Sequence, residues 1–211
     1  MKLQFNPGLD FQQEAIQAVT DVFRGQEACR TQFSVPLLGN QPTLTGTGDG
    51  DLGIGNRLHL HQDDEILANV QAVQLRNGLK QSAAIGAMDF CVEMETGTGK
   101  TYVYLRTIYE LHQQYGFSKF IIVVPSIAIK EGVHKSLQIT REHLRGLYGN
   151  VNADFFVYDS QKLGQVRNFA TADCIQIMVI NIDAFRRSFT DPAKETKANI
   201  IHRANDRLSG T

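Results

Sequence analysis

Residues 88–108 read "MDFCVEMETGTGKTYVYLRTI", and this stretch decides the fold class. The apolar run 88–94 predicts a short strand, and 102–116 has the pattern of a helix that ends at Gly116. A Gly-rich turn lies between them. A strand, a Gly-rich turn and a helix in this order are the context of a phosphate-binding loop, so we expect a nucleotide site here.

Each residue type in the turn has a physical reason to meet phosphate. Gly97 and Gly99 can adopt backbone angles that other residues avoid, which lets main-chain N–H groups approach oxyanions. The following helix N-terminus adds N–H donors and a partial positive charge. We predict that Lys100, the expected catalytic residue, reaches the β- and γ-phosphates of ATP and that the Thr101 hydroxyl coordinates Mg²⁺. The predicted nucleotide-binding residues of the loop are Glu95, Thr96, Gly97, Thr98, Gly99, Lys100 and Thr101.

A second Thr-Gly-Thr-Gly stretch, at 45–50, lacks the groups that bind phosphate. Asp49 stands where the first stretch has Lys100, so the charge is repulsive, and Gly50 replaces the Thr101 hydroxyl. We predict no strand before this stretch and no helix after it. A calcium loop is the alternative, but the EF-hand spacing is missing. We therefore predict one phosphate site, and a surface loop over 39–56.

The remaining pattern alternates strands and helices. Continuous apolar runs predict strands at 119–125, 154–159 and 174–182, with a helix over 127–147 between the first two. Such runs are typical of a parallel sheet buried on both faces, so the expected fold class is doubly wound α/β.

Two helices are expected before the phosphate loop. The first covers about Asp10–Phe23 with Asp10 as its N-cap, and the second covers 63–79 with Gly78 at its end.

Composition excludes several classes of protein. The net charge is −1, from 21 Lys+Arg and 22 Asp+Glu, so any contact with nucleic acid needs a local basic face. No apolar run reaches the ~18–20 residues that span a bilayer, and the N-terminus does not resemble a signal peptide. Cys29, Cys91 and Cys174 are too far apart for a zinc knuckle or a disulfide framework. We expect a cytoplasmic protein.

Two neighbouring motifs together are specific for a family. "METGTGKTYVYLRTIYEL" (94–111) followed by "KFIIVVPSIAIKEGV" (119–133) resembles the helicase-nuclease (Res) subunit of type III restriction enzymes, which are superfamily 2 helicase-like motors. The strict phosphate-loop pattern has Gly at the position of Met94, but motors of this group do not require it. The resemblance implies a P-loop NTPase (RecA-like) parallel sheet flanked by helices.

The resemblance also implies roles for residues outside the loop. "LDFQQEAI" (9–16) resembles the Q motif, in which Gln12 would pair with the adenine edge of ATP. The alternative is a solvated glutamine on an N-terminal helix.

"VPSIAIKEG" (124–132) resembles a motif that contacts the DNA backbone, which would assign Ser126 and Lys130 to nucleic acid. The alternative is an ordinary strand-to-helix turn. "VINIDAFRR" (179–187) resembles a later motif at a strand end, where Arg186 and Arg187 either face nucleic acid or lie on a solvated surface.

Two further groups of polar residues are weaker candidates for a metal site. His59 and His61 lie near acidic residues, but without a second ligand pair an exposed polar loop is favoured. Asp183 ends an apolar strand, as a Mg²⁺-binding acid does, yet it lacks the neighbouring Glu that would orient water.

We expect three regions: 1–24 with the Q-like motif, 25–87 as an insertion, and 88–211 as a partial RecA-like domain, truncated at its C-terminus. The resemblance implies a DExx-type acidic motif, a second RecA-like domain and an endonuclease domain, none of which follows Lys100. The chain is thus expected to be the ATP-binding portion of a restriction motor, incomplete for hydrolysis alone. Its expected partners are double-stranded DNA and a methyltransferase subunit.

Two alternatives stay open: a fragment of another superfamily 2 DNA helicase, and a non-catalytic nucleotide-binding remnant. A small-molecule kinase would also have a phosphate loop, but it would leave the motifs at 9–16 and 124–132 unexplained.

Overall fold

The computed structural model describes residues 5–28, 30–35, 51–159 and 162–186. The chain divides into two compact units. Unit 1 comprises Met1–Thr31, Gly55–Ser118 and Ile139–Val151, and unit 2 comprises Gln32–Ile54, Lys119–Gln138 and Asn152–Thr211. The three regions expected from the sequence remain a prediction.

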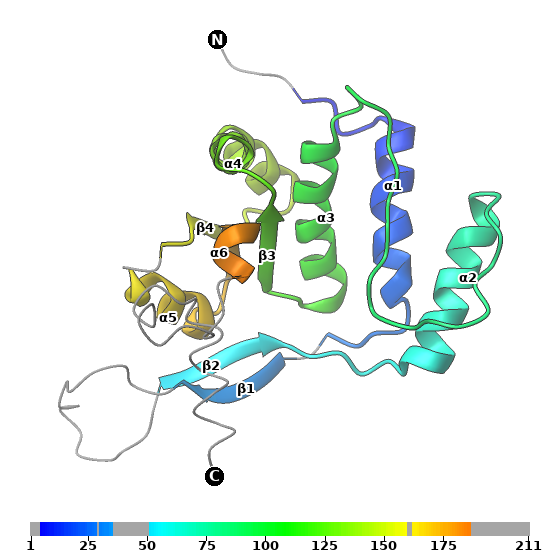
Figure 1. Cartoon of the computed structure of the whole chain (residues 1–211), viewed down its shortest axis with the longest axis horizontal. Coiled ribbons are helices and arrows are strands. Elements are labelled where there is room, and N and C mark those ends of the chain that lie inside the picture. Colours follow the sequence, from blue (N-terminus) through cyan, green and yellow to red (C-terminus); the bar gives the residue numbers. More distant parts are fainter. Residues whose placement is uncertain (1–4, 29, 36–50, 160–161, 187–211) are drawn as a thin grey trace. The chain divides into compact units, whose positions relative to one another are not determined.

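Two helices packed side by side form the centre of unit 1 (Figure 1). They are α1 (Asp10–Thr20), which continues as a 3₁₀ turn (Asp21–Phe23), and α3 (Lys100–Tyr115). Both predicted helices are confirmed. Gly116 follows α3 with φ +71°, the left-handed conformation that ends a helix. The Tyr115 hydroxyl donates a 3.0 Å hydrogen bond to the Thr20 carbonyl and so joins the C-terminal ends of the two helices.

The predicted N-cap of α1 is wrong by one residue. Leu9, with extended backbone, is the N-cap residue, and its side chain makes no capping hydrogen bond. Asp10 is the first residue of the helix. An aspartate in the first turn still favours the helix, because its carboxylate lies near the positive end of the helix dipole.

A third helix, α2 (Leu67–Arg76), covers a small apolar core in the same unit. It follows a π turn over Gln62–Ile66, so the helix predicted over 63–79 is confirmed in its main part. The predicted C-cap is wrong by one residue: Asn77 is the cap, and Gly78 follows it with φ +67°. The core consists of Val22, Leu60, Ile66 and Val70, with Phe23 and Ile85 packed against it.

The strand predicted at 88–94 is wrong. Residues 77–99 contain neither helix nor strand, and Met88, Phe90 and Val92 are 39–45% exposed. The segment is not a continuous apolar run, because Asp89 and Glu93 alternate with the apolar residues. A segment with acidic side chains on one face does not suit a sheet buried on both faces.

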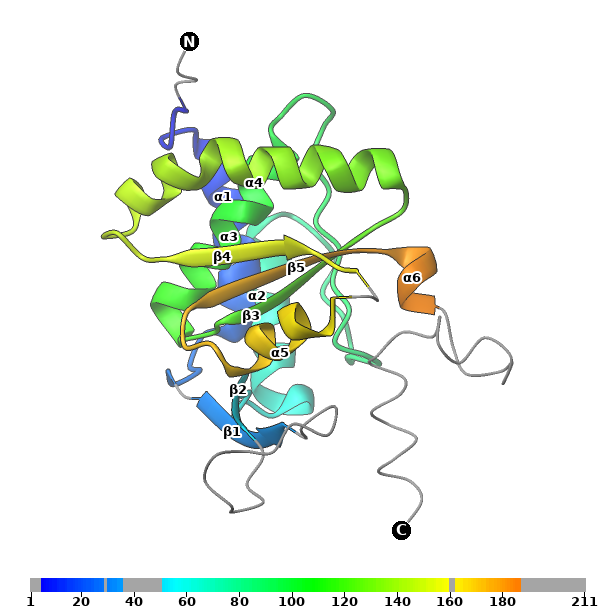
Figure 2. The same ribbon diagram turned by 90° about the vertical axis from the view of Figure 1, so that its left-hand side faces the viewer.

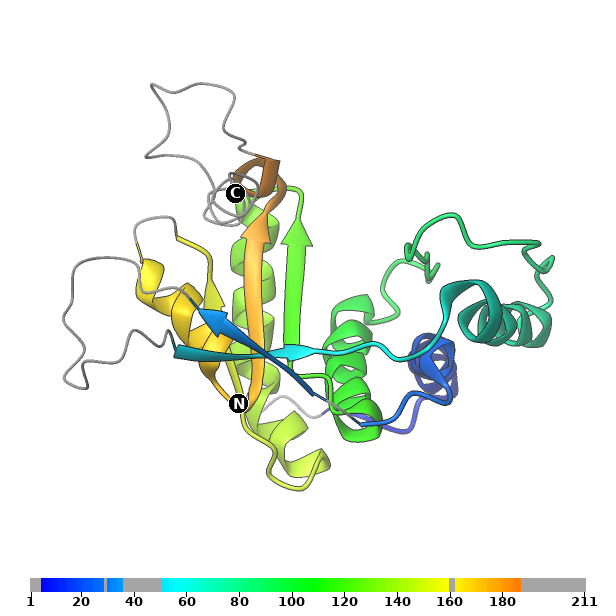
Figure 3. The same cartoon turned by 90° about the horizontal axis from the view of Figure 1, so that it is seen from below.

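Unit 2 contains a parallel three-stranded sheet in the order β3-β5-β4, and Figure 3 shows β3 and β5 side by side. Its strands are β3 (Lys119–Val124), β4 (Ala153–Val157) and β5 (Ile175–Asn181). The register places Ile177 opposite both Phe120 and Phe155. All three predicted strands are confirmed. The central strand β5 is buried over residues 175–180, as a strand with neighbours on both sides must be.

Helices cover both faces of this sheet (Figure 2). His134 of α4 (Ile127–Leu147) packs edge-on against Phe155, and Phe169 of α5 (Leu163–Thr171) packs edge-on against Phe156. Adjacent strand residues point to opposite faces, so α4 and α5 cover opposite sides of β4. A short helix, α6 (Ile182–Arg186), follows β5 directly. The predicted fold class, α/β with a parallel sheet flanked by helices, is confirmed.

A second, two-stranded sheet was not predicted. It pairs β1 (Arg30–Val35) with β2 (Asp51–Asn56), so the loop predicted over 39–56 is wrong for 51–56, and a strand does precede the second Thr-Gly-Thr-Gly stretch. The glycines at 53 and 55 hid the strand pattern of β2. The stretch 45–50 itself lies outside the described residues. Over the described ranges, no helix combines the length and apolar character needed to span a membrane.

Candidate nucleotide site

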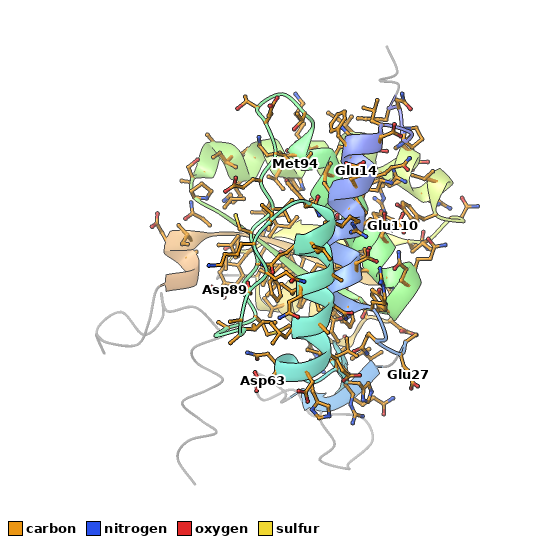
Figure 4. All side chains as sticks on the ribbon, turned by 90° about the vertical axis from the view of Figure 1, so that its right-hand side faces the viewer. Glu14, Glu27, Asp63, Asp89, Met94 and Glu110 are labelled. Atoms are coloured by element: carbon orange, nitrogen blue, oxygen red, sulfur yellow. The ribbon has the colours of Figure 1, made fainter. Side chains whose placement is uncertain are left out.

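The loop before α3 is closed by contacts with its own lysine. Lys100 Nζ donates hydrogen bonds to the carbonyls of Met94 and Glu95, at 2.8 and 2.7 Å. Thr98 Oγ1 donates to the Glu95 carbonyl at 2.7 Å. Figure 4 labels Met94 where this loop begins. The loop therefore holds its curved shape around an ammonium group without the preceding strand that the sequence pattern predicted.

Two glycines make this curve possible. Gly97 and Gly99 have φ of +84° and +82°, the left-handed region that other residues rarely adopt. A Cβ on Gly99 would also lie 2.7 Å from Gln12 Nε2, so the Gln12 side chain would have to shift. Glycine at position 99 therefore suits both the backbone conformation and the close approach of Gln12.

Gln12 of α1 lies against this loop. Its Nε2 donates a 2.8 Å hydrogen bond to the Thr98 carbonyl, and the residue is only 6% exposed. Its Oε1 is buried and has no hydrogen-bond partner among the described residues. A buried acceptor without a donor is costly, so this atom points to a ligand that supplies one. The structure thus brings the Q-motif glutamine and the phosphate loop together, while the contact with adenine remains a prediction.

The start of α3 provides groups that suit an anion. Lys100 and Thr101 are its first two residues, and the first turn of a helix leaves N–H groups without intrahelical partners. Lys100, Glu95 and Thr96 are exposed and Thr101 is half-buried. An ammonium, helix N–H groups and one hydroxyl fit a triphosphate with Mg²⁺. The individual roles predicted for Lys100 and Thr101 are consistent with this geometry and stay predictions.

Ser126 and Lys130 lie in unit 2, at the junction of β3 and α4. Ser126 Oγ accepts a 3.3 Å hydrogen bond from the Ile129 N–H, and the Ser126 carbonyl accepts one from the Lys130 N–H at 3.0 Å. Ser126 therefore caps α4, a structural role that belongs to the alternative of an ordinary strand-to-helix turn. Contact of either side chain with nucleic acid remains a prediction.

The weaker metal candidates do not converge. The His59 N–H donates to Gln26 Oε1 and the His61 N–H donates to Glu65 Oε2, while Asp183 is exposed at the start of α6. In the part of the chain that the structure describes, no group of three or more His, Cys, Asp or Glu could hold a metal ion.

The side chain of Arg186 and the whole of Arg187 lie outside the described residues. Their predicted place beside a nucleic acid therefore stays a prediction.

A polar cluster around Arg106 and Glu110 of α3 was not predicted from the sequence. Arg106 Nε donates to the Tyr148 hydroxyl at 3.0 Å, and that hydroxyl donates to Glu110 Oε1 at 2.6 Å. Burial raises the pKa of Tyr148, and the hydrogen bond to Glu110 adds to the rise. The i,i+4 spacing of Arg106 and Glu110 was visible in the sequence, but Tyr148 comes from a distant segment.

Comparison with known proteins gives one consistent result. A family model described as "Type III restriction enzyme, res subunit" matches residues 9–206. The StyLTI Res subunit of Salmonella typhimurium is 44% identical over 107 residues, which are 43% of this chain and 11% of that protein. The EcoP15I Res subunit of Escherichia coli is 41% identical over 101 residues, 44% of this chain and 10% of that protein. The EcoPI Res subunit of Escherichia phage P1 is 32% identical over 166 residues, 75% of this chain and 15% of that protein.

Proposed function

Because the chain belongs to the family of type III restriction enzyme Res subunits, we propose that it is the ATP-binding portion of a DNA-dependent restriction motor. The chain spans only 10–15% of the length of the three relatives above. The activity and partners of the whole protein are therefore part of the proposal.

One observation carries the proposal: Gln12 and Lys100 both form hydrogen bonds to backbone carbonyls of the same loop. The loop offers an ammonium group from Lys100 and a free buried acceptor from Gln12, and the N-terminus of α3 lies beside them. These groups match the two ends of ATP. Lys100 and the helix N–H groups bind the phosphates, and Gln12 Oε1 accepts from the amino group of adenine.

Thr101 would hold Mg²⁺ through its hydroxyl, together with phosphate oxygens and water. When bound, the ion neutralises charge that develops on the phosphates. The chain has no DExx-type acidic motif after Lys100, and such a motif polarises the attacking water in this class of motor. We accordingly propose that residues 1–211 bind ATP but hydrolyse it slowly at most.

Double-stranded DNA is the proposed macromolecular partner, bound through its backbone. Ser126 and Lys130 at the start of α4 would contribute a hydroxyl and an ammonium to phosphate contacts, which position a protein on DNA without reading sequence. The proposal includes a methyltransferase subunit that reads the DNA site, and a cytoplasmic location.

A titration of residues 1–211 with a fluorescent ATP analogue and Mg²⁺ tests the nucleotide site. Lys100→Ala removes a charged hydrogen-bond donor, so we expect Kd to rise about tenfold or more. Lys80→Ala, which alters an exposed lysine of the same unit, is the matched control and should leave Kd unchanged. Equal binding by wild type and Lys100→Ala would contradict the proposed site.

Release of inorganic phosphate from ATP, followed over time in the same protein, tests the second part of the proposal. We expect residues 1–211 to turn over ATP at about 1 s⁻¹ or below, which is slower than a working motor. Fast, sustained turnover that Lys100→Ala abolishes would show that residues 1–211 are a complete ATPase.

A further inference from the structure

The segment before α1, residues 5–9, is fastened to α3, and we call it the N-terminal strap. The Phe5 ring stacks on the Tyr102 ring with centroids 5.5 Å apart and planes only 3° from parallel. Arg106 Nη1 donates a 2.6 Å hydrogen bond to the Pro7 carbonyl. Tyr102 and Arg106 are four residues apart and so lie on the same face of α3. Two contacts, one helical turn apart, hold the strap.

Arg106 is itself held in position. Besides Pro7, its guanidinium donates from Nε to the Tyr148 hydroxyl, and its Nη2 lies 3.9 Å from Glu110 Oε1. The side chains of Arg106 and Glu110 are only 12% and 21% exposed. A planar guanidinium that makes several hydrogen bonds has one preferred orientation, so the Pro7 carbonyl has a defined place.

The strap leads directly into the helix that carries Gln12. The Pro7 carbonyl also accepts a 3.0 Å hydrogen bond from Gln13 Nε2, which fixes the strap against the first turn of α1. Gln12, the preceding residue, reaches Thr98 in the phosphate loop, and that loop runs into α3 at Lys100. The contacts form a closed circuit within unit 1, from the loop through α3, Arg106, the strap and α1 back to the loop.

The contact with Thr98 decides which atom of the Gln12 amide is free. A carbonyl can only accept, so Nε2 must face Thr98 and Oε1 is the group left over. A free acceptor suits the 6-amino group of adenine and repels the 6-carbonyl of guanine. An amide that could leave Thr98 and rotate would accept either base.

We propose that Arg106 is a positioning residue for base selection: by holding the Pro7 carbonyl it keeps the Gln12 amide on Thr98, with Oε1 turned to an adenine base. This inference rests on the proposed nucleotide site. Arg106 does not contact the loop, so its loss leaves phosphate binding intact and lowers the preference for ATP over GTP.

The test is to measure Kd for Mg-ATP, Mg-GTP and Mg-tripolyphosphate with residues 1–211. The variants are Arg106→Gln, which removes the guanidinium, and Tyr148→Phe, which removes only the hydroxyl that orients it. Arg24→Gln is the matched control, because Arg24 is an exposed arginine that pairs with Asp21 at the other end of α1. Thermal unfolding of each variant shows that it is folded at the titration temperature.

We expect the ATP-to-GTP affinity ratio to fall about tenfold in Arg106→Gln and about threefold in Tyr148→Phe, the loss that one misplaced hydrogen bond produces. Tripolyphosphate binding should stay within about twofold of wild type in every variant, as should the ratio in Arg24→Gln.

Other outcomes overturn the inference in distinguishable ways. If Arg106→Gln is folded and its ATP-to-GTP affinity ratio equals that of wild type, Arg106 has no role in base selection. If Arg106→Gln does not fold, an unchanged ratio in Tyr148→Phe leads to the same conclusion. Equal loss for ATP and tripolyphosphate means that Arg106 only supports the fold. A wild-type protein that binds tripolyphosphate but prefers neither base overturns the inference alone. A wild-type protein that binds neither nucleotide nor tripolyphosphate overturns the proposed function as well.

Discussion

Gln12 Nε2 donates a 2.8 Å hydrogen bond to the carbonyl of Thr98, 86 residues further along the chain. This bond joins two sequence motifs that are recognised separately, one at the start of α1 and one before α3. Since the donor is buried and the acceptor belongs to the phosphate loop, a change in the conformation of the loop also changes where the Gln12 amide is held.

Gly99→Ala should be destabilising for two reasons. The left-handed backbone costs an alanine roughly 1–2 kcal/mol. The new Cβ would also lie 2.7 Å from Gln12 Nε2, so Gln12 must move and lose its bond to Thr98. Adding a crowded methyl group costs a further ~1 kcal/mol or more. Urea unfolding should therefore show a loss of about 2–3 kcal/mol.

Gly97→Ala is the matched control, because Gly97 has the same backbone conformation and nothing lies within 4 Å of a Cβ placed there. It should lose only the backbone part, about 1–2 kcal/mol. In a Gln12→Ala background the extra cost at Gly99 should vanish. Equal losses for the two glycines in the wild-type background would show that the approach of Gln12 to Gly99 has no energetic weight.

Leu105→Ala tests the packing of α3 within unit 1. Leu105 is 0% exposed, so its truncation removes apolar contacts and leaves a cavity, at a cost of about 2–5 kcal/mol. Leu75→Ala is the same change at a residue of α2 that is 67% exposed, and it should cost less than ~0.5 kcal/mol. The free energy of unfolding in urea measures both, and similar values for the two variants would contradict the burial of Leu105.

The elements that could be predicted from sequence are those in which one local signal dominates. β3 is apolar from Phe120 to Val124 and β5 from Ile177 to Ile180, and α3 begins at a Gly-Lys-Thr turn and ends at a left-handed glycine. The segment 88–94 failed because its apolar residues alternate with acids, and the pattern alone does not say whether a partner strand lies beside it. β2 failed because its pattern is diluted by glycine.

Residues of the candidate site also fall into two groups, those that a local motif predicts and those that depend on contacts between distant segments. Lys100, Gly97 and Gly99 are contiguous, so a short motif with a physical mechanism was enough to find them. Arg106 and Tyr148 were missed because their roles depend on contacts with Pro7 and with each other across 42 to 99 residues of chain. No periodicity in the sequence records such contacts, because they depend on how the segments at Pro7 and Tyr148 pack against α3.

His143 should make stability depend on pH. Its Nε2 lies 2.8 Å from the Tyr102 hydroxyl, its ring packs on Phe5, and burial followed by the nearby Arg106 charge lowers its pKa below 6.5. The unfolded chain therefore takes up this proton at a higher pH than the folded chain does. The stability that neutral His143 provides is complete above about pH 6.5 and is lost as pH falls through the folded-state pKa.

Urea unfolding of wild type and His143→Gln at pH 7.5, 6.5 and 5.5 measures this effect. The difference in the free energy of unfolding between the two proteins should shrink as the pH falls. His59→Gln changes an exposed histidine and is the control: its difference from wild type in the free energy of unfolding is measured at the same three pH values. A wild-type advantage over His143→Gln that grows on acidification would mean that folding raises the pKa of His143 instead.

Two substitutions of Ser126 separate its capping role from the proposed contact with DNA. Ser126→Ala removes the oxygen that accepts from the Ile129 N–H and should cost about 1 kcal/mol in urea unfolding. Ser126→Asp keeps an acceptor and an acid at the start of α4, so stability should be retained, but its carboxylate would repel a DNA phosphate. Fluorescence anisotropy with duplex DNA at low salt should then show the highest affinity for wild type, a lower affinity for Ser126→Ala and the lowest for Ser126→Asp. The two variants should rank the other way in stability, so a loss of DNA binding that follows from unfolding can be told apart. If Ser126→Asp binds DNA as well as wild type does, Ser126 serves α4 alone.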